Sequence, residues 1–144
     1  MTNNTAPVIH EKNDPQLISH LGNVHIMMAE HGLEPSLSAL IELRASQMNQ
    51  CAYCVNMHLN DARKAKISQE KIDKLIVWRH VDVFTSAERA VLAWTEALTV
   101  LDQKTDYASL RADLREHFSD KEITVITTDI GMINLWNRMQ ISKH

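Results

Sequence analysis

Glycine and proline are scarce in this sequence, with three of each among 144 residues. No segment alternates apolar and polar residues between turn signals, as the strands of a half-buried sheet do. Apolar residues instead recur at intervals of three and four, which is the spacing of a helix face. These features argue against β-sheet folds and predict an all-α fold class.

Long apolar runs and an excess of charge of one sign are also missing. No run approaches the ~20 apolar residues that cross a membrane, and residues 1–14 lack the apolar core of a secretion signal. The net charge of −3 gives no electrostatic reason to expect nucleic acid or an anionic membrane as a partner. We therefore expect a cytoplasmic protein that binds neither.

Cysteine occurs only as Cys51 and Cys54. In a cytosolic chain, so close a pair is more often redox-active or metal-binding than structural. A zinc site takes four ligands and only His58 is a further ligand nearby, so we predict no metal and no other cofactor. A thioredoxin would need a βαβ pattern, which this sequence lacks. The pair taken alone also fits a structural or incidental role.

The length and composition indicate one domain, residues 15–144, which follows a loose N-terminal arm, residues 1–14. We expect six or seven helices. Helical spacing and capping residues place them at 15–31, 37–48, 51–66, 68–78, 85–101, 107–118 and 119–139. Asn49 is expected to break the chain and to cap the third helix, and residues 79–84 are expected to form a connector.

The last predicted helix is apolar on more than one face, so it must be covered by its own domain or by another subunit. Together with seven methionines in a small protein, this favours a homo-oligomer.

Several other side chains are expected to have structural or surface positions without a catalytic role. We expect three tryptophans in the core, one packed tyrosine, one solvated acid and three histidines at the surface or facing a partner: Trp78, Trp94, Trp136; Tyr53; Asp61; His20, His25, His31.

The stretch from Cys51 to His58 carries the most specific chemical pattern. The two cysteines are three residues apart, and the histidine follows Cys54 by four. On a helix, positions i, i+3 and i+7 fall within an arc of roughly 60°. Two thiols and an imidazole on one surface outline a redox or peroxide-reducing site.

The spacing also suggests a catalytic cycle. A free thiol titrates near pH 8.5, so only ~3% is thiolate at pH 7. His58 lies one turn from Cys54 and can take its proton, whereas a helix dipole would favour Cys51; we prefer Cys54 as the attacking thiol. The resulting sulfenic acid would condense with Cys51, because an i, i+3 pair places Cα atoms ~5 Å apart. A dithiol reductant would then reset the pair.

The stretch from Leu43 to His58 resembles the core motif of the alkyl hydroperoxidase D-like proteins of the carboxymuconolactone decarboxylase superfamily. The resemblance covers roughly residues 24 to 140 and continues through separate blocks at 62–65, 78–79, 86–99, 117–119 and 134–138. It implies an all-helical fold, assembly into trimers or hexamers, and thiol peroxidase activity on hydroperoxides with a dithiol or disulfide-reductase electron donor. By this likeness Cys54 matches the attacking cysteine, Cys51 the resolving cysteine and His58 the proton-relay histidine.

The sequence departs from this pattern at two positions. The peroxidases place a relay glutamate twelve residues before the first cysteine, where this chain has Ala39. Glu42 lies three residues later, ~60° around a helix, and either reaches His58 or is a surface acid. The family also usually has glycine before the first cysteine, where this chain has Gln50.

Two other functions are compatible with the residues. The chain could be a non-catalytic oligomeric module whose cysteines sense redox state or stabilise an interface. It could also be a lyase of the decarboxylase type that uses His58 as its base, although that branch normally lacks the cysteine pair.

Overall fold

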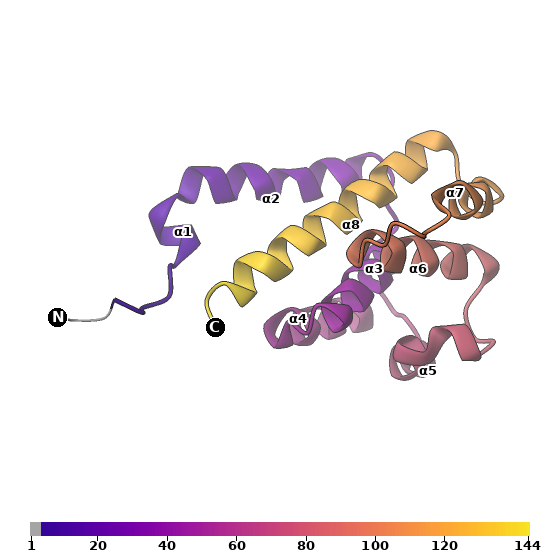
Figure 1. The fold of residues 1–144 in the computed structure, drawn as a ribbon, viewed down its shortest axis with the longest axis horizontal. Coiled ribbons are helices and arrows are strands. Elements are labelled where there is room, and N and C mark those ends of the chain that lie inside the picture. Colours follow the sequence, from indigo (N-terminus) through magenta and orange to yellow (C-terminus); the bar gives the residue numbers. More distant parts are fainter. Residues whose placement is uncertain (1–3) are drawn as a thin grey trace.

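The computed structural model describes residues 4–144, which fold into helices joined by short turns (Figure 1). No strand occurs in this part of the chain, which confirms the all-α prediction. There are more helices than the expected six or seven, because a single turn forms near the N-terminus and a 3₁₀ helix continues directly from α5. The elements are α1 (His10–Asn13), α2 (Pro15–Glu30), α3 (Pro35–Met48), α4 (Ala52–Lys64), α5 (Gln69–Lys74), η1 (Leu75–His80), α6 (Ser86–Thr99), α7 (Tyr107–Arg115) and α8 (Asp120–Ile141).

Helix α3 lies at the centre of the molecule and packs against α4, α6 and α8 (Figure 1). One core cluster joins it to α4, α5 and η1, and a second joins it to α6, α7 and α8. Consecutive buried residues cover every side of a helix, so α3 has no continuous solvent face. These residues are Ala39, Leu40, Ile41, Glu42, Leu43, Ala45 and Ser46.

Helix α8 is covered on two sides by other parts of the same chain. Val125 and Met132 pack against Met28 of α2, and Figure 1 shows α2 running alongside α8 at the edge of the bundle. Because α2 covers this second apolar face, the apolar character of α8 does not by itself require another subunit. Its other apolar face packs into the core with α3 and α6 through Ile126, Ile130 and Ile133.

The junction between α3 and α4 differs from the prediction. Asn49 does not cap α4 but ends α3, and its side chain donates hydrogen bonds to Asn134 and Asn137 of α8, each 2.9 Å long. The N-cap of α4 is Cys51, whose sulfur accepts the backbone N–H of Cys54 at 3.3 Å. The amide acceptors on α8 explain the difference, because they engage the Asn49 side chain that would otherwise cap the helix.

Other boundaries follow the predicted signals more closely. The capping boxes at Thr85 with Glu88 and at Ser119 with Glu122 are both present. Within the N-terminal arm, His10 of α1 shares a 2.8 Å hydrogen bond with Ser142 beyond the end of α8. The expected connector at 79–84 begins inside η1 rather than after it. Among the described residues, no helix has the length and apolar character needed to cross a membrane.

Glu96 of α6 connects its own helix to α3 and η1. Its carboxylate accepts hydrogen bonds from Arg44 of α3 (2.8 Å) and from Trp78 (2.9 Å) and Arg79 (3.0 Å) of η1. Burial raises the pKa of Glu96, but these donors outweigh burial and leave that pKa below its ordinary value. The ionised carboxylate therefore fixes α3 against η1 and α6.

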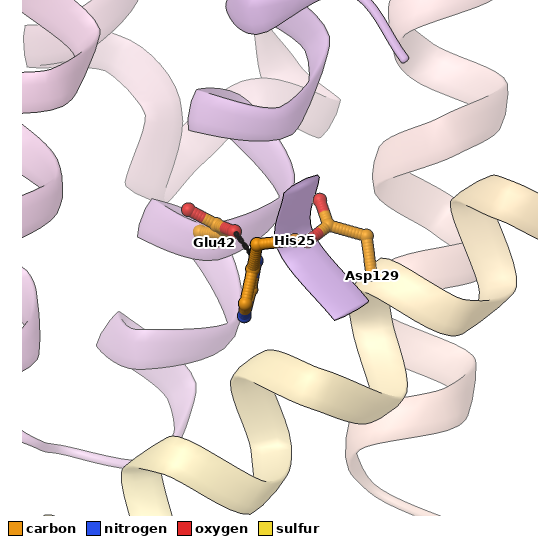
Figure 2. A group of neighbouring side chains, drawn as sticks. All are labelled: His25, Glu42 and Asp129. Carbon is orange, nitrogen blue, oxygen red and sulfur yellow. Dashed lines mark ion pairs between the residues drawn. The ribbon is translucent and has the colours of Figure 1, made fainter. Parts of the chain in front are cut away.

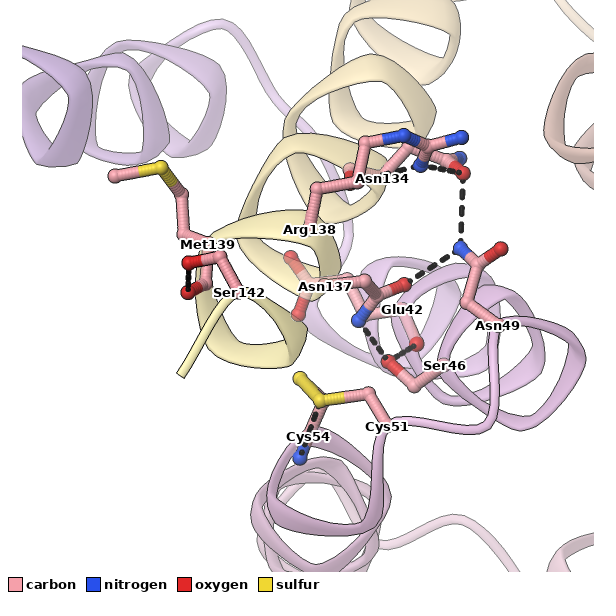
Figure 3. Close-up of a disulfide and its surroundings, with 10 residues drawn as sticks. All are labelled: Glu42, Ser46, Asn49, Cys51, Cys54, Asn134, Asn137, Arg138, Met139 and Ser142. Carbon is pink, nitrogen blue, oxygen red and sulfur yellow. Dashed lines mark hydrogen bonds between the residues drawn. A yellow bond between two sulfur atoms is a disulfide. The ribbon is translucent and has the colours of Figure 1, made fainter. Parts of the chain in front are cut away.

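A buried polar network holds the end of α3 against α8 (Figure 3). The Asn137 side chain is fully buried; it donates to Ser46 Oγ at 3.0 Å and accepts from Asn49 at 2.9 Å. Ser46 in turn donates to the Glu42 carbonyl. Satisfied networks of this kind specify one arrangement of the helices, and this one fixes the turn that leads into Cys51.

We expect Asn137→Ala to lower the free energy of unfolding by about 2–3 kcal/mol, because it removes the donor to the buried Ser46 hydroxyl and one of the two acceptors of the half-buried Asn49 amide. Urea denaturation measures this difference. Asn60→Ala is the matched control, since Asn60 is exposed on α4 and should change stability by less than about 0.5 kcal/mol. Equal stability of the two variants would contradict the role given to the network.

Candidate functional site

The two cysteines form a disulfide at the start of α4 (Figure 3). Their Cα atoms are 5.2 Å apart, close to the separation predicted from the sequence. Cys51 is fully buried and Cys54 is 3% exposed. The pair that the sequence singles out is therefore joined covalently and lies just below the surface.

A cavity of about 440 Å³ opens beside Cys54, and it is mainly apolar with polar groups on one side. Cys51 is not among its lining residues, so Cys54 is the cysteine that faces it. The lining comes from α2, α3, α4 and α8: His25, Glu42, Tyr53, Cys54, Met57, His58, Asp61, Trp136 and Gln140.

His58 is buried beside this cavity, one turn after Cys54. Its Nδ1 atom lies 3.2 Å from Glu42 Oε2 and 3.1 Å from Asp61 Oδ2. Burial lowers the pKa of His58, but the hydrogen bonds and charges of Glu42 and Asp61 outweigh burial and raise that pKa above its ordinary value. Because both carboxylates hold Nδ1, the other ring nitrogen, Nε2, is the one that can exchange protons with the cavity.

Glu42 is the carboxylate at the centre of the site. It is only 9% exposed, and its Oε1 atom lies 3.7 Å from His25 Nδ1 (Figure 2). Burial raises the pKa of Glu42, but the His58 imidazole, the neighbouring Asp129 carboxyl and the charges of the two histidines bring that pKa below its ordinary value. Of the two alternatives left by the sequence, contact with His58 is the one observed. Ala39, the position of the missing glutamate, instead packs in the core between α3 and α4.

His25 and Trp136 join the site from α2 and α8. The Trp136 indole N–H donates to His25 Nε2 at 2.7 Å, and the two rings stack 6.1 Å apart. His25 was expected at the surface or facing a partner, and Trp136 in the core. Both predictions are incomplete, because the contact between the two rings depends on how α2 lies along α8. Trp78 and Trp94 are buried as predicted.

A protein-family model matches a stretch of 79 residues of this chain. The model of the carboxymuconolactone decarboxylase family matches residues 19–97, more than half of the chain, including both cysteines, His58 and Glu42. The chain belongs to the carboxymuconolactone decarboxylase family. Within the superfamily it is similar to the alkyl hydroperoxidase D-like proteins, as the motif from Leu43 to His58 predicted.

Three proteins illustrate what the chain is similar to. A crystal structure of a protein of unknown function from Agrobacterium tumefaciens, ATU0492, described as a candidate antioxidant defence protein AhpD, shares 36% identity over 96% of this chain and 95% of that one, with a TM-score of 0.88. The uncharacterized protein YdfG of Bacillus subtilis is 36% identical over 72% of this chain and 70% of its own length. The debrominase Bmp8, 20% identical over 92% of this chain and 71% of that one with a TM-score of 0.80, shares the fold.

Gln50 stands where the family usually has glycine, yet it adopts the backbone conformation that glycine favours. Its φ angle is +54°, in the left-handed region that costs a non-glycine residue roughly 1–2 kcal/mol. The Asn49 and Cys51 anchors on either side hold the chain in this turn. The turn before the disulfide therefore stays tight despite the substitution.

Two further groups in the site were given other roles by the sequence analysis. Asp61 was expected to be solvated, but helical spacing places it at i+3 from His58 and within ion-pair distance. Tyr53 was expected to pack, but it is 60% exposed and lines the cavity, as does Met57 one turn later. The helical wheel of α4 could have indicated only Asp61, which lies about 60° from His58, because it places Met57 about 100° and Tyr53 about 140° away from His58.

Asp129 of α8 is the residue that sequence analysis missed altogether. It is fully buried, and its Oδ2 atom accepts a 2.9 Å hydrogen bond from Ser38. The only signal in the sequence is an acid inside the apolar stripe of Ile126, Ile130 and Ile133. Such a residue needs a partner wherever the helix packs.

Two sets of side chains bring three potential metal ligands within 4.8 Å of one another in the described part of the chain. Both sets contain Glu42, in one case with His25 and Asp129 and in the other with His58 and Asp61. Since the same carboxylate already pairs with two imidazoles, we assign these contacts to ion pairing and hydrogen bonding. No cysteine belongs to either set.

Glu42→Gln is expected to lower the pKa of His58, because it removes the carboxylate that contributes most to raising it and leaves the effect of burial. Asp61→Asn should lower that pKa less, since Asp61 is more exposed than Glu42. NMR titration of the His58 ring protons measures both shifts. Glu70→Gln, at an exposed pair with Lys74, is the control, and an unchanged His58 pKa in Glu42→Gln would contradict this account.

Proposed function

We propose that this protein is a thiol-dependent peroxidase that reduces organic hydroperoxides through the Cys51–Cys54 pair. The observation that supports it best is the meeting of Cys54, His58 and Glu42 at one cavity, where Cys54 belongs to a disulfide. The family membership and the similarity to a candidate antioxidant defence protein support the same class of chemistry.

In the reduced protein, His58 takes the proton of the Cys54 thiol, and the thiolate attacks the terminal oxygen of the hydroperoxide. The O–O bond breaks, Cys54 becomes a sulfenic acid, and the alkoxide takes the proton from His58 to leave as an alcohol. The Cys51 thiol then attacks the Cys54 sulfur, and water leaves as the disulfide forms. An external dithiol returns the pair to two thiols and is itself oxidised to a disulfide.

The two cysteines have environments that suit these different roles. Cys54 lines the cavity, where a substrate oxygen can approach it. Cys51 is fully buried and its sulfur accepts the Cys54 N–H at the helix N-terminus. That position stabilises negative charge on sulfur, so Cys51 is the better leaving thiolate when the donor attacks the disulfide.

The charged groups are arranged for proton transfer. Glu42 and Asp61 raise the pKa of His58, which makes its ring a stronger acceptor of the Cys54 proton. Glu42 thus takes the part of the relay glutamate that the family pattern places at Ala39. Tyr53, Met57 and Trp136 give the cavity apolar surface for the organic part of a hydroperoxide.

A decarboxylase-type lyase with His58 as its base is the second candidate, supported by the family model itself. In such an enzyme the cysteines would not react. The two functions therefore differ in whether removing the Cys54 sulfur abolishes activity.

We expect Cys54→Ser to abolish consumption of an alkyl hydroperoxide in the presence of a dithiol, because no sulfenic acid can form. Cys51→Ser should still form one sulfenic acid per chain, trapped by dimedone, without forming the intramolecular disulfide. His58→Ala should lower the rate roughly 10²–10⁴-fold, the usual contribution of a proton-transfer group.

His80→Ala is the matched control, since His80 is an exposed histidine at the end of η1. It should leave the rate unchanged. Circular dichroism establishes that each variant is folded. Turnover that survives in a folded Cys54→Ser variant, or lyase activity lost only in His58→Ala, would overturn the peroxidase proposal.

We also propose that copies of this chain assemble, as trimers or hexamers, through the outer side of α2. Ile26 and Met27 are 59% and 54% exposed there, beyond the apolar face that α2 uses to cover α8. Exposed apolar residues that cluster on one element are typical of subunit contacts.

Light scattering should therefore give a molar mass three or six times the 16.4 kDa of one chain. Ile26→Asp should shift the mass toward that of one chain, because it places a charge in the contact. A mass of one chain for the unaltered protein at micromolar concentration would contradict assembly.

A further inference from the structure

Asp129 presents a carboxyl oxygen to the interior with nothing to satisfy it. The Oδ2 atom accepts from Ser38, but Oδ1 is buried and has no hydrogen-bond partner in the part of the chain described. A charged oxygen in that position would lack both water and a donor, which is a strongly unfavourable state. An oxygen that carries a proton needs only an acceptor.

Glu42 supplies that acceptor. Ligand-type atoms of His25, Glu42 and Asp129 all lie within 4.8 Å of one another, and Figure 2 shows the three side chains converging from α2, α3 and α8. Two ionised carboxylates repel at this separation in a dry site, whereas a carboxylic acid and a carboxylate attract. The geometry thus allows only one negative charge between Glu42 and Asp129.

We infer that Asp129 is a neutral carboxylic acid that donates a hydrogen bond from Oδ1 to Glu42 and so acts as a positioning residue for that carboxylate. The protonation state that we infer for Asp129 does not depend on the proposed function. Its effect on turnover rests on the proposed function, in which Glu42 serves His58.

The surrounding groups determine which of the two acids keeps the proton. Glu42 of α3 faces His25 from α2 and His58 from α4, with Asp61 beyond His58, and both imidazoles favour its ionised form. Asp129 forms no ion pair with any described residue, although His25 lies within 4.8 Å of it; burial and then the charge of Glu42 raise its pKa, and only Ser38 opposes them. The proton therefore stays on Asp129 and the charge on Glu42.

This arrangement gives Glu42 a fixed direction. A donor from α8 holds one side of the carboxylate while Oε2 faces His58 Nδ1 at 3.2 Å. The same donor disperses part of the negative charge, so Glu42 accepts a hydrogen bond from His58 without removing its proton. Protonated His58 then remains available to the alkoxide.

Asp129→Asn tests the inference, because an amide can accept from Ser38 and donate to Glu42 yet cannot ionise. A carboxylic acid C=O band should persist at pH 8 in the infrared spectrum of the reduced protein and be absent from Asp129→Asn. The pH profile of hydroperoxide turnover should be unchanged in that variant. Asp129→Leu, of similar size without polar atoms, should lower kcat about tenfold with KM unchanged, since one buried hydrogen bond is lost.

Absence of the band at pH 8, or its persistence in Asp129→Asn, would show that Asp129 is ionised or that another acid holds the proton, and would overturn the inference. A pH profile displaced in Asp129→Asn would overturn it as well. If the band behaves as expected but the unaltered protein has no hydroperoxide turnover, the inference on Asp129 holds and the proposed function fails.

Discussion

The ion pair between Glu42 and His58 is the constraint on which the rest of the site depends. A carboxylate on a helix that is buried on all sides cannot remain charged without donors around it. His58 from α4 and His25 from α2 lie within ion-pair distance of Glu42, and the donor that we infer from α8 is Asp129. The polar groups of the cavity can therefore be understood as solvating one buried charge on α3 with side chains from three other helices.

This requirement links the catalytic groups to the packing of the bundle. Ser46 lies one turn after Glu42 and bonds its carbonyl, and Asn137 connects Ser46 to Asn49. The same short stretch thus ties the backbone of α3 at Glu42 to the turn that leads to Cys51. A displacement of α8 would disturb the turn that leads to the disulfide, because Asn49 is anchored to two side chains of α8.

Much of the fold could be predicted from local signals in the sequence. The capping boxes at 85–88 and 119–122 satisfy backbone groups of their own helices, so no tertiary contact is needed to recognise them. The separation of the cysteines likewise follows from helix geometry alone. Asn49 failed as a cap for the opposite reason, since its partners lie on α8, 85 or more residues later.

The residues of the site also fall into two groups, those that local sequence signals could predict and those that only helix packing brings together. Cys54, His58 and Asp61 are one turn apart on α4, and their proximity is a property of any helix with this sequence. His25, Trp136 and Asp129 reach the cavity only because α2 lies along α8 and α8 crosses α3. No periodicity in α2 distinguishes His25 from His20 or His31, so its role could not be predicted before the helices were placed.

The acids around His58 also let its two ring nitrogens do different things. In the proposed reaction, proton exchange must occur on the cavity side of His58, at Nε2, while Nδ1 is held by acids that do not take its proton. The depressed pKa of Glu42 meets the second condition, because a weak base accepts a hydrogen bond from imidazolium without deprotonating it. An isolated glutamate buried at this depth would have a raised pKa and would compete for that proton. The neighbours of Glu42 on α2 and α8 therefore support the proposed chemistry, although neither helix carries the cysteine motif.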